Sequence, residues 1–278
     1  MILYQDQIVP ESEVRISLRD RGYYFGDGIY EVFRLYNGIL FERDAHLARL
    51  ERSTAAVRIP LPCTLEELGS RLERLATASG VTNGTLYMQI TRGEAPRTHA
   101  FPANTQPVLT GWCTELNRPL ETMDSGITAV TLDDIRWHRC DLKTLNLLPS
   151  VLAKQEALDR GAEDAILHRS GVVTECTASN VMIVKNGAIY THPLDHYILH
   201  GITRAVICQL SAQEGIPFHE QSFTLEDLRN ADEVFLTGTT TEVTPIVKID
   251  DQPVGIVGKP GPVTRRLQRS FEQYAGLS

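Results

Sequence analysis

Lysine is scarce in this sequence. The 278 residues include 22 arginines but only five lysines, which are Lys143, Lys154, Lys185, Lys248 and Lys259. Because a lysine amine is the side chain that forms a Schiff base with an aldehyde, such chemistry is confined to these five positions. Acidic residues outnumber basic ones and the formal net charge is −8. This balance argues against a nucleic-acid partner, since phosphate contacts need a basic surface.

Cysteine is also scarce, and no Cys-x-x-Cys pair occurs among the five cysteines. An odd number without such spacing indicates reduced thiols, as in a cytoplasmic protein, rather than a disulfide framework. No apolar run is long enough to span a membrane, and Asp6 comes too early for a secretory signal, so we expect no membrane partner. The GxSxG, phosphate-loop and GxGxxG motifs are missing as well.

The spacing of apolar residues predicts an α+β fold. Asn37-Gly38 lies between two apolar runs and predicts a hairpin. Asp44 is a candidate helix cap, and Thr64-Leu-Glu-Glu67 forms a capping box for a helix that ends at Gly80. Further strands are expected at 85–91, 107–114, 127–132, 164–168, 172–175, 181–184, 188–191, 233–237 and 243–249, and further helices at 146–160, 202–214, 224–230 and 262–274.

Two domains are expected, because Asn117-Arg-Pro-Leu120 has the composition of a linker. We predict an N-terminal domain over 1–118, a linker over 119–124 and a C-terminal domain over 125–278.

Lys143 is the strongest candidate among the lysines. Lys185, Lys248 and Lys259 lie at turns or strand ends, and Lys154 points away from the apolar stripe of the helix at 146–160 (Leu147, Leu148, Val151, Leu152 and Leu158). Lys143 lies between a strand region and a helix start, where burial lowers the pKa of an amine and makes it nucleophilic. The simpler alternative is a lysine neutralised by Asp141.

Three other segments carry residues typical of a binding site. Glu175 ends an apolar strand before small hydroxyl residues, although a capping or turn acid is the plainer interpretation. Gly201-Ile-Thr-Arg204 opens a helix, and a helix N-terminus binds phosphate through its free N–H groups. Thr237-Gly-Thr-Thr-Thr241 is a second hydroxyl-rich turn. Together with Lys143, these segments outline a phosphate site beside an aldehyde anchor.

Arg97 and His99 lie in a loop that follows Thr91-Arg-Gly-Glu-Ala-Pro96. Arginine binds a carboxylate through two parallel hydrogen bonds, so this loop is a candidate carboxylate site. A solvated basic loop is the alternative. His192, His196 and His200 recur at helical spacing, but Pro193 and the following residues predict a loop, so we expect no metal site.

Taken together, these motifs resemble the fold-type IV enzymes that use pyridoxal 5′-phosphate (PLP), the class IV aminotransferase family, and within it the D-amino-acid aminotransferases. The matching segments are Asp20–Glu31, Thr91–His99, Asp134–Leu148, Val173–Asn180, Gly201–Arg204 and Thr237–Pro245. The resemblance implies a smaller N-terminal α/β domain and a larger C-terminal β-barrel-like domain with helices. It also implies a homodimer with the active site shared between subunits.

The resemblance assigns roles to individual residues. Lys143 is implied as the Schiff-base lysine and proton shuttle, and Glu175 as the group that keeps the pyridine nitrogen protonated. The remaining implied cofactor-binding residues are Arg49, Leu199, Ile202, Thr203 and Thr239, and the implied substrate-binding residues are Tyr30, Arg97 and His99.

The implied reaction is transamination of D-amino acids, with D-alanine and 2-oxoglutarate giving pyruvate and D-glutamate. Two positions depart from the family pattern: Cys176 stands where relatives have Gly, and Gly238 where a close relative has Ser. The alternatives are another fold-type IV activity (aminodeoxychorismate lyase, L-branched-chain or (R)-amine transaminase) or a PLP-binding protein without turnover. Retention of both Lys143 and Glu175 argues against the last.

Overall fold

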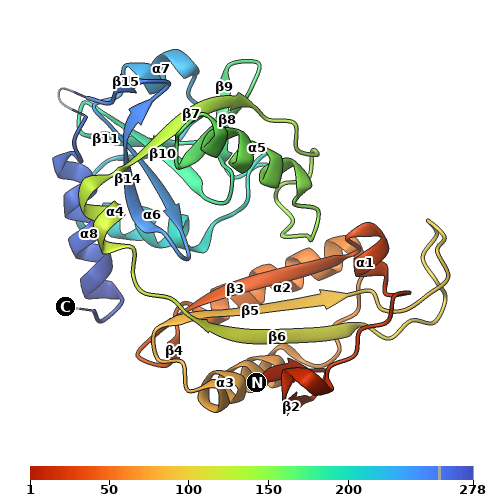
Figure 1. Cartoon of the computed structure of the whole chain (residues 1–278). Helices are drawn as coiled ribbons and strands as arrows, with labels where there is room; N and C mark the ends of the chain where they lie inside the picture. The colour runs from red at the N-terminus through yellow and green to blue at the C-terminus, as the bar shows by residue number, and fades with distance from the viewer. Residues whose placement is uncertain (256–257, 278) are drawn as a thin grey trace. The chain divides into compact units, whose positions relative to one another are not determined.

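The computed structural model describes residues 1–255 and 258–277 (Figure 1). The chain divides into two compact units, Met1–Asn117 with Leu142–Asn146, and Arg118–Asp141 with Leu147–Ser278. The domain limits expected from the sequence stay a prediction. Over the described ranges, no helix is long and apolar enough to cross a membrane.

The first unit is a six-stranded antiparallel sheet with two long helices. Its strand order is β2-β1-β6-β5-β3-β4. The strands are β1 (Ile2–Tyr4), β2 (Gln7–Val9), β3 (Gly28–Tyr36), β4 (Ile39–Leu40), β5 (Gly84–Thr91) and β6 (Val108–Glu115). The helices are the 3-10 turn η1 (Glu11–Glu13), α1 (Arg21–Phe25), α2 (Arg43–Val57) and α3 (Leu65–Ser79).

Alternation along β3 gives the first sheet one apolar face. Phe33 and Leu35 belong to the apolar core with Leu50 of α2 and Leu72 of α3, whereas Tyr30 stacks on the aromatic side chains of the other face. The hairpin predicted at Asn37-Gly38 is confirmed, with positive φ at both residues.

The helix caps confirm one prediction and correct another. Thr64 accepts a hydrogen bond from Glu67 N (3.2 Å), and Gly80 ends α3 in the left-handed conformation, as the sequence predicts. Asp44, however, is not the cap of α2. Glu42 holds the N-cap position, and Asp44 lies in the first turn, where Arg43 Nε donates to it (2.8 Å).

A short segment from further along the chain completes the first unit. β4 pairs with β3 only at Leu35 and Tyr36, so the beginning of β3 has a free edge. The segment 142–146 occupies this edge: Tyr30 N donates to Lys143 O and Leu145 N to Gly28 O, both at 3.0 Å. The backbone of Lys143 is therefore fixed by sheet hydrogen bonds.

The second unit is built on a nine-stranded mixed sheet with the order β12-β11-β10-β13-β14-β7-β8-β9, and β15 pairs with β14. The strands are β7 (Ile127–Asp133), β8 (Asp164–Arg169), β9 (Val172–Cys176), β10 (Asn180–Lys185), β11 (Ala188–Thr191), β12 (Phe218–Glu220), β13 (Glu233–Gly238), β14 (Glu242–Ile249) and β15 (Gln252–Pro253). The helices are α4 (Leu120–Ser125), α5 (Leu148–Asp159), α6 (Ile202–Gln213), α7 (Leu225–Arg229) and α8 (Pro262–Tyr274). The predicted α+β class is confirmed.

Two features of the second unit differ from the sequence prediction. Helix α4 occupies most of the expected linker, with Met123 buried. The helix at 146–160 exists as α5, but Ala153 and Ala157 are the residues that pack on β7 and β8. The apolar stripe named from the sequence, Leu147, Leu148, Val151, Leu152 and Leu158, is exposed.

Candidate active site

Lys143 lies against an aromatic ring in the first unit. Its Nζ is 4.2 Å from the ring centroid of Tyr30, and its backbone N donates to Ser53 Oγ on α2 at 3.4 Å. Tyr30 in turn stacks on Tyr87, with centroids 5.6 Å apart. The amine is therefore held over an aromatic face rather than on a flexible surface turn.

The other lysines have different surroundings. Lys154, Lys185 and Lys248 each lie within 4.0 Å of a carboxylate oxygen, and Lys259 is exposed. Asp141, which the sequence offers as the neutralising group for Lys143, instead accepts two hydrogen bonds from Arg139.

Arg49 lies on α2 in a buried charged network. Its Nε and Nη2 donate to the two carboxylate oxygens of Glu31, each at 2.8 Å. The Nδ1 atom of His46 is 2.8 Å from Glu31 Oε2. Glu31 has no exposed surface, so these contacts replace its hydration and fix the guanidinium on the helix.

The protonation states in this network follow from its geometry. Burial by itself raises the pKa of Glu31, but the charge and hydrogen bonds of Arg49 and His46 outweigh it and hold that pKa well below its usual range. Burial lowers the pKa of His46, although Glu31 opposes this. His46 is therefore neutral near pH 7, with its proton on Nδ1, where it donates to the carboxylate.

Arg97 and His99 lie in an exposed loop of the first unit, and both approach the ring of Phe25. The Arg97 Cζ atom is 5.3 Å from the Phe25 centroid, and the His99 ring is 5.6 Å from it. Through this shared contact, the two candidate carboxylate-binding residues lie near one another.

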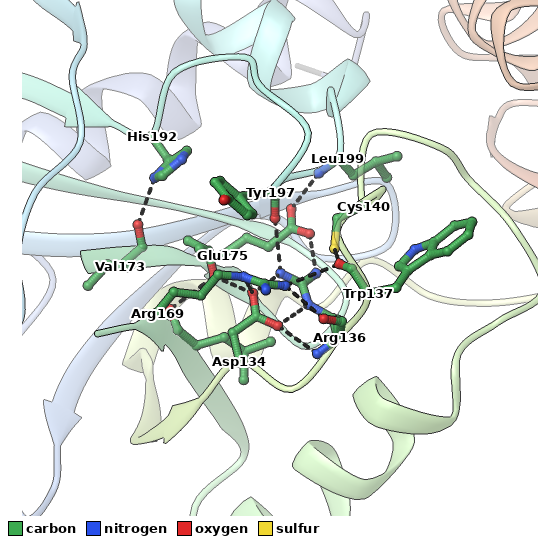
Figure 2. A network of polar contacts seen from close by, with 12 residues as sticks. Asp134, Arg136, Trp137, Cys140, Arg169, Val173, Glu175, His192, Tyr197 and Leu199 are labelled. Carbon is green, nitrogen blue, oxygen red and sulfur yellow. Dashed lines mark hydrogen bonds and ion pairs between the residues drawn. The ribbon is translucent and has the colours of Figure 1, made fainter. Parts of the chain in front are cut away.

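Glu175 lies at the end of β9 in the second unit, with three hydrogen-bond donors around its carboxylate (Figure 2). Arg136 Nη1 donates to Oε1, while Asn180 Nδ2 (2.9 Å) and Leu199 N (3.0 Å) donate to Oε2. Burial raises the pKa of Glu175, whereas Arg136 and the Leu199 N–H oppose that shift. Since all three neighbours donate, the arrangement favours the ionised carboxylate.

Arg136 is held by a second carboxylate. Asp134 accepts from Arg136 Nε (2.9 Å) and Nη2 (2.8 Å), and it also accepts from Arg169 and Thr174. Figure 2 shows this network around Glu175. Because both sides of the guanidinium are occupied, Arg136 is fixed in its contact with Glu175.

A group of buried hydroxyls lies beside the start of α6. The side-chain oxygens of Ser179, Thr237 and Thr241 are buried without a hydrogen-bond partner in the part of the chain that the structure describes. A Cβ on Gly238 would be 2.7 Å from Thr241 Oγ1 and 3.3 Å from Ser179 Cβ, so the glycine keeps these groups close together.

The N-terminus of α6 adds backbone donors. Gly201 caps the helix without a side-chain hydrogen bond, and Ile202 and Thr203 form its first turn. A Cβ on Gly201 would overlap Asn180 Oδ1, so this helix end packs directly on the residue that contacts Glu175. Buried hydroxyls and a helix N-terminus together suit the oxygens of a phosphate.

Thr239 lies half-buried in the turn after β13, in the same hydroxyl-rich segment. The segment after Pro193 is a loop, as predicted. His192 contacts Val173 O and Asp195 through its two ring nitrogens.

The family model for "Amino-transferase class IV" matches residues 28–249. The chain belongs to this family. It is 48% identical to a D-alanine aminotransferase of Staphylococcus haemolyticus over 98% of this chain and 97% of that one. It is 45% identical to a D-alanine aminotransferase of Bacillus licheniformis over 98% of this chain and 95% of that one.

Solved structures show the same fold. A branched-chain amino acid aminotransferase of Escherichia coli superimposes with a TM-score of 0.93 at 27% identity, covering 99% of this chain and 93% of that chain. The branched-chain enzyme of T.th. with pyridoxamine 5′-phosphate gives a TM-score of 0.91 at 28% identity, covering 100% and 94%. The predicted fold-type IV architecture is confirmed, and the cofactor of class IV aminotransferases is PLP.

The residues described above fit this cofactor. The hydroxyl group and the α6 N-terminus match a phosphate, a buried carboxylate matches a protonated ring nitrogen, and Lys143 supplies an amine. Some contributors were missed from the sequence: Glu31, His46 and Asn180 contact the candidate residues directly, and Arg136 contacts Glu175. Helical spacing links His46 to Arg49, but no local pattern links Glu31 to α2.

A pH titration tests the buried histidine. The folded-state pKa of His46 is lowered, so the unfolded state binds its proton first as the pH falls through the ordinary range near 6.5. The free energy of unfolding is therefore retained above that pH and is lost below it, by up to about 1.4 kcal/mol per pH unit for one group.

Urea unfolding between pH 7.5 and 5.5 should show this loss in the native protein and a smaller loss in His46→Gln. His219→Gln, at an exposed position, serves as the control and should follow the native curve. Parallel curves for His46→Gln and the native protein would contradict the neutral buried histidine.

Proposed function

We propose that this protein uses PLP to transfer amino groups between D-amino acids and 2-oxo acids, with D-alanine and 2-oxoglutarate giving pyruvate and D-glutamate. The observation that carries this proposal is the similarity to D-alanine aminotransferases over nearly the whole chain.

Lys143 holds the cofactor through its Nζ and then moves a proton at the substrate Cα. Two observations support this role. The backbone of Lys143 is fixed on β3, and its amine lies over Tyr30. A fixed amine delivers and removes a proton on one side of the substrate, which limits turnover to one enantiomer.

Bound PLP supplies a ring that accepts the electron pair left on Cα when the proton is removed. Glu175 keeps a proton on the ring nitrogen, because an ionised carboxylate stabilises that positive charge. Arg136 and Asn180 orient the carboxylate, and Leu199 lies at the cofactor ring.

The phosphate is bound by the α6 N-terminus at Ile202 and Thr203, with Thr239 and Arg49. Free N–H groups and the helix dipole favour an anion at such an end. The contacts of Arg49 with Glu31 and His46 restrict its guanidinium to one orientation.

Tyr30, Arg97 and His99 bind the substrate α-carboxylate. Arg97 supplies the paired donors that a carboxylate accepts, and His99 lies beside it at Phe25. Retention of this pair favours an amino acid over a simple amine as substrate.

The second candidate is an L-branched-chain transaminase, because the solved branched-chain enzymes superimpose closely on this chain. Stereochemistry separates the two functions, so the choice of enantiomer decides between them.

A homodimer in the cytoplasm completes the proposal. The exposed apolar stripe on α5 (Leu147, Leu148, Val151, Leu152 and Leu158) supports the dimer, since such a stripe is typical of a subunit interface. The five free cysteines support a reducing compartment, which fractionation of the source cells would check.

A half-reaction tests the function. The PLP-loaded protein should lose its visible cofactor absorbance rapidly with D-alanine, and far more slowly with L-alanine, L-leucine or (R)-1-phenylethylamine. Lys143→Ala should lose both the lysine-bound cofactor spectrum and nearly all turnover, whereas Lys154→Ala should keep both. A fast reaction with L-leucine and none with D-alanine would replace the first candidate with the second.

Glu175→Gln should bind PLP yet slow proton removal by about 10²- to 10⁴-fold, because a neutral amide does not hold the ring nitrogen protonated. Stopped-flow measurement of the D-alanine half-reaction gives the rate, and Glu121→Gln on α4 is the exposed control. An unchanged rate in Glu175→Gln would refute its electronic role.

Val151→Lys should convert the dimer into monomers, since a charge in an apolar interface is costly to bury. Gln155→Lys, at another exposed position of α5, should leave the dimer intact. Sedimentation equilibrium distinguishes the two, and a dimeric Val151→Lys protein would rule out this helix as the interface.

A further inference from the structure

The loop 93–101 carries Arg97 and His99 but contains no helix or strand of its own. Most of its side chains are exposed, so its own packing contributes little order. Ordering one residue of flexible backbone costs about 1–2 kcal/mol. A bidentate carboxylate site nevertheless needs its side chains held in one geometry. Contacts from outside the loop must therefore restrict it.

Arg21 of α1 makes the most direct of these contacts. Its guanidinium side chain is only 3% exposed, and its Nη1 donates to the backbone oxygen of Thr98 at 2.6 Å, with Ala100 O at 3.5 Å. Thr98 lies between the two candidate carboxylate-binding residues. The backbone N of Arg21 also donates to Gly93 O (2.9 Å), so one residue contacts the loop at its start and at its centre.

Asp27 fixes the orientation of Arg21. Its Oδ2 accepts from Arg21 Nε at 2.7 Å, and both of its oxygens accept from Arg92, at 2.8 and 2.9 Å. Asp27 thus lies between two guanidinium groups. A group of two cations and one buried anion keeps a net positive charge beneath the loop, which favours a carboxylate there.

Phe101 fastens the far end of the loop. Its ring is 48% exposed, yet the Cζ atoms of Arg92 and Arg58 lie 3.7 and 4.7 Å from its centroid. Two cations on one ring stabilise its position through cation–π attraction. Arg92 therefore connects Asp27 with the last residue of the loop.

The ring of Phe25 joins these contacts to the binding side chains. Arg21 Cζ lies 4.9 Å from the Phe25 centroid, and Arg97 Cζ lies 5.3 Å from the same centroid. His99 also approaches this ring. The guanidinium that fixes the loop backbone and the guanidinium that binds substrate therefore share one aromatic contact.

We propose that Arg21 is a positioning residue for the substrate carboxylate: together with Asp27, Arg92 and Phe101 it holds the loop 93–101 in the conformation in which Arg97 and His99 bind. This inference rests on the proposed role of Arg97 and His99. Arg21 itself touches neither the substrate nor the cofactor in this proposal.

The test uses Arg21→Lys in the PLP-loaded, full-length protein. Lysine keeps the positive charge near Asp27, but its single ammonium cannot also reproduce the guanidinium contact with Thr98 O. KM for D-alanine should rise about tenfold, the effect of losing roughly 1.4 kcal/mol of binding, with kcat changed less than about threefold. The half-reaction with (R)-1-phenylethylamine, which has no carboxylate, should not change.

Amide hydrogen exchange supplies a readout independent of activity. Peptides covering 93–101 should exchange at least about fivefold faster in Arg21→Lys, because the loop opens more often. Phe101→Ala, at an exposed position that folding does not depend on, should give the same two effects. Arg19→Lys is the matched control, since its side chain is exposed, and it should change neither KM nor exchange.

Arg97→Ala separates this inference from the proposed function. If Arg97→Ala raises KM for D-alanine while Arg21→Lys and Phe101→Ala change neither KM nor exchange, the positioning role is wrong and the carboxylate site stands. If Arg97→Ala affects the amino acid and the amine equally, the carboxylate site itself is wrong, and the positioning role falls with it.

Discussion

Removal of a carboxylate from water is costly unless fixed donors replace the lost hydration, and this constraint governs the polar interior of the protein. Glu31, Asp27 and Glu175 each meet it with arginine: Arg49 for the first, Arg21 and Arg92 for the second, and Arg136 for the third. Every one of these arginines gains a defined orientation in return. The high ratio of arginine to lysine in the sequence agrees with this use, because the planar guanidinium forms paired hydrogen bonds that an ammonium does not.

Much of the fold could be predicted from local patterns. The Asn37-Gly38 hairpin, the Thr64 cap and the strands of both sheets follow from turn residues, capping chemistry and apolar alternation. Helix α4 was missed because it is one short helix in a segment of linker composition. The stripe on α5 shows the opposite limit, since periodicity reveals an amphipathic helix but not what covers its apolar face.

The candidate site was less accessible from sequence. Lys143 could be singled out by elimination, and Glu175 by its place at a strand end. Their surroundings could not, because Glu31 and Arg49 meet across a strand and a helix 18 residues apart, and Arg136 and Glu175 are 39 residues apart. Such pairs depend on sheet register and helix docking, which no local spacing encodes. The contacts of Arg21 with Thr98 and Ala100 belong to the same class.

The segment 142–146 has a consequence for synthesis on the ribosome. It belongs to the first sheet, although the preceding 24 residues, Arg118–Asp141, belong to the second unit. While the chain is being made, residues 1–117 emerge with the first half of β3 unpaired along one edge, and an unpaired edge is open to pairing with other chains. That edge is closed only when residues 142–146 emerge. The same backbone that protects the nascent sheet from aggregation carries Lys143, so the first sheet reaches its final hydrogen bonding only when the candidate reactive amine has been added.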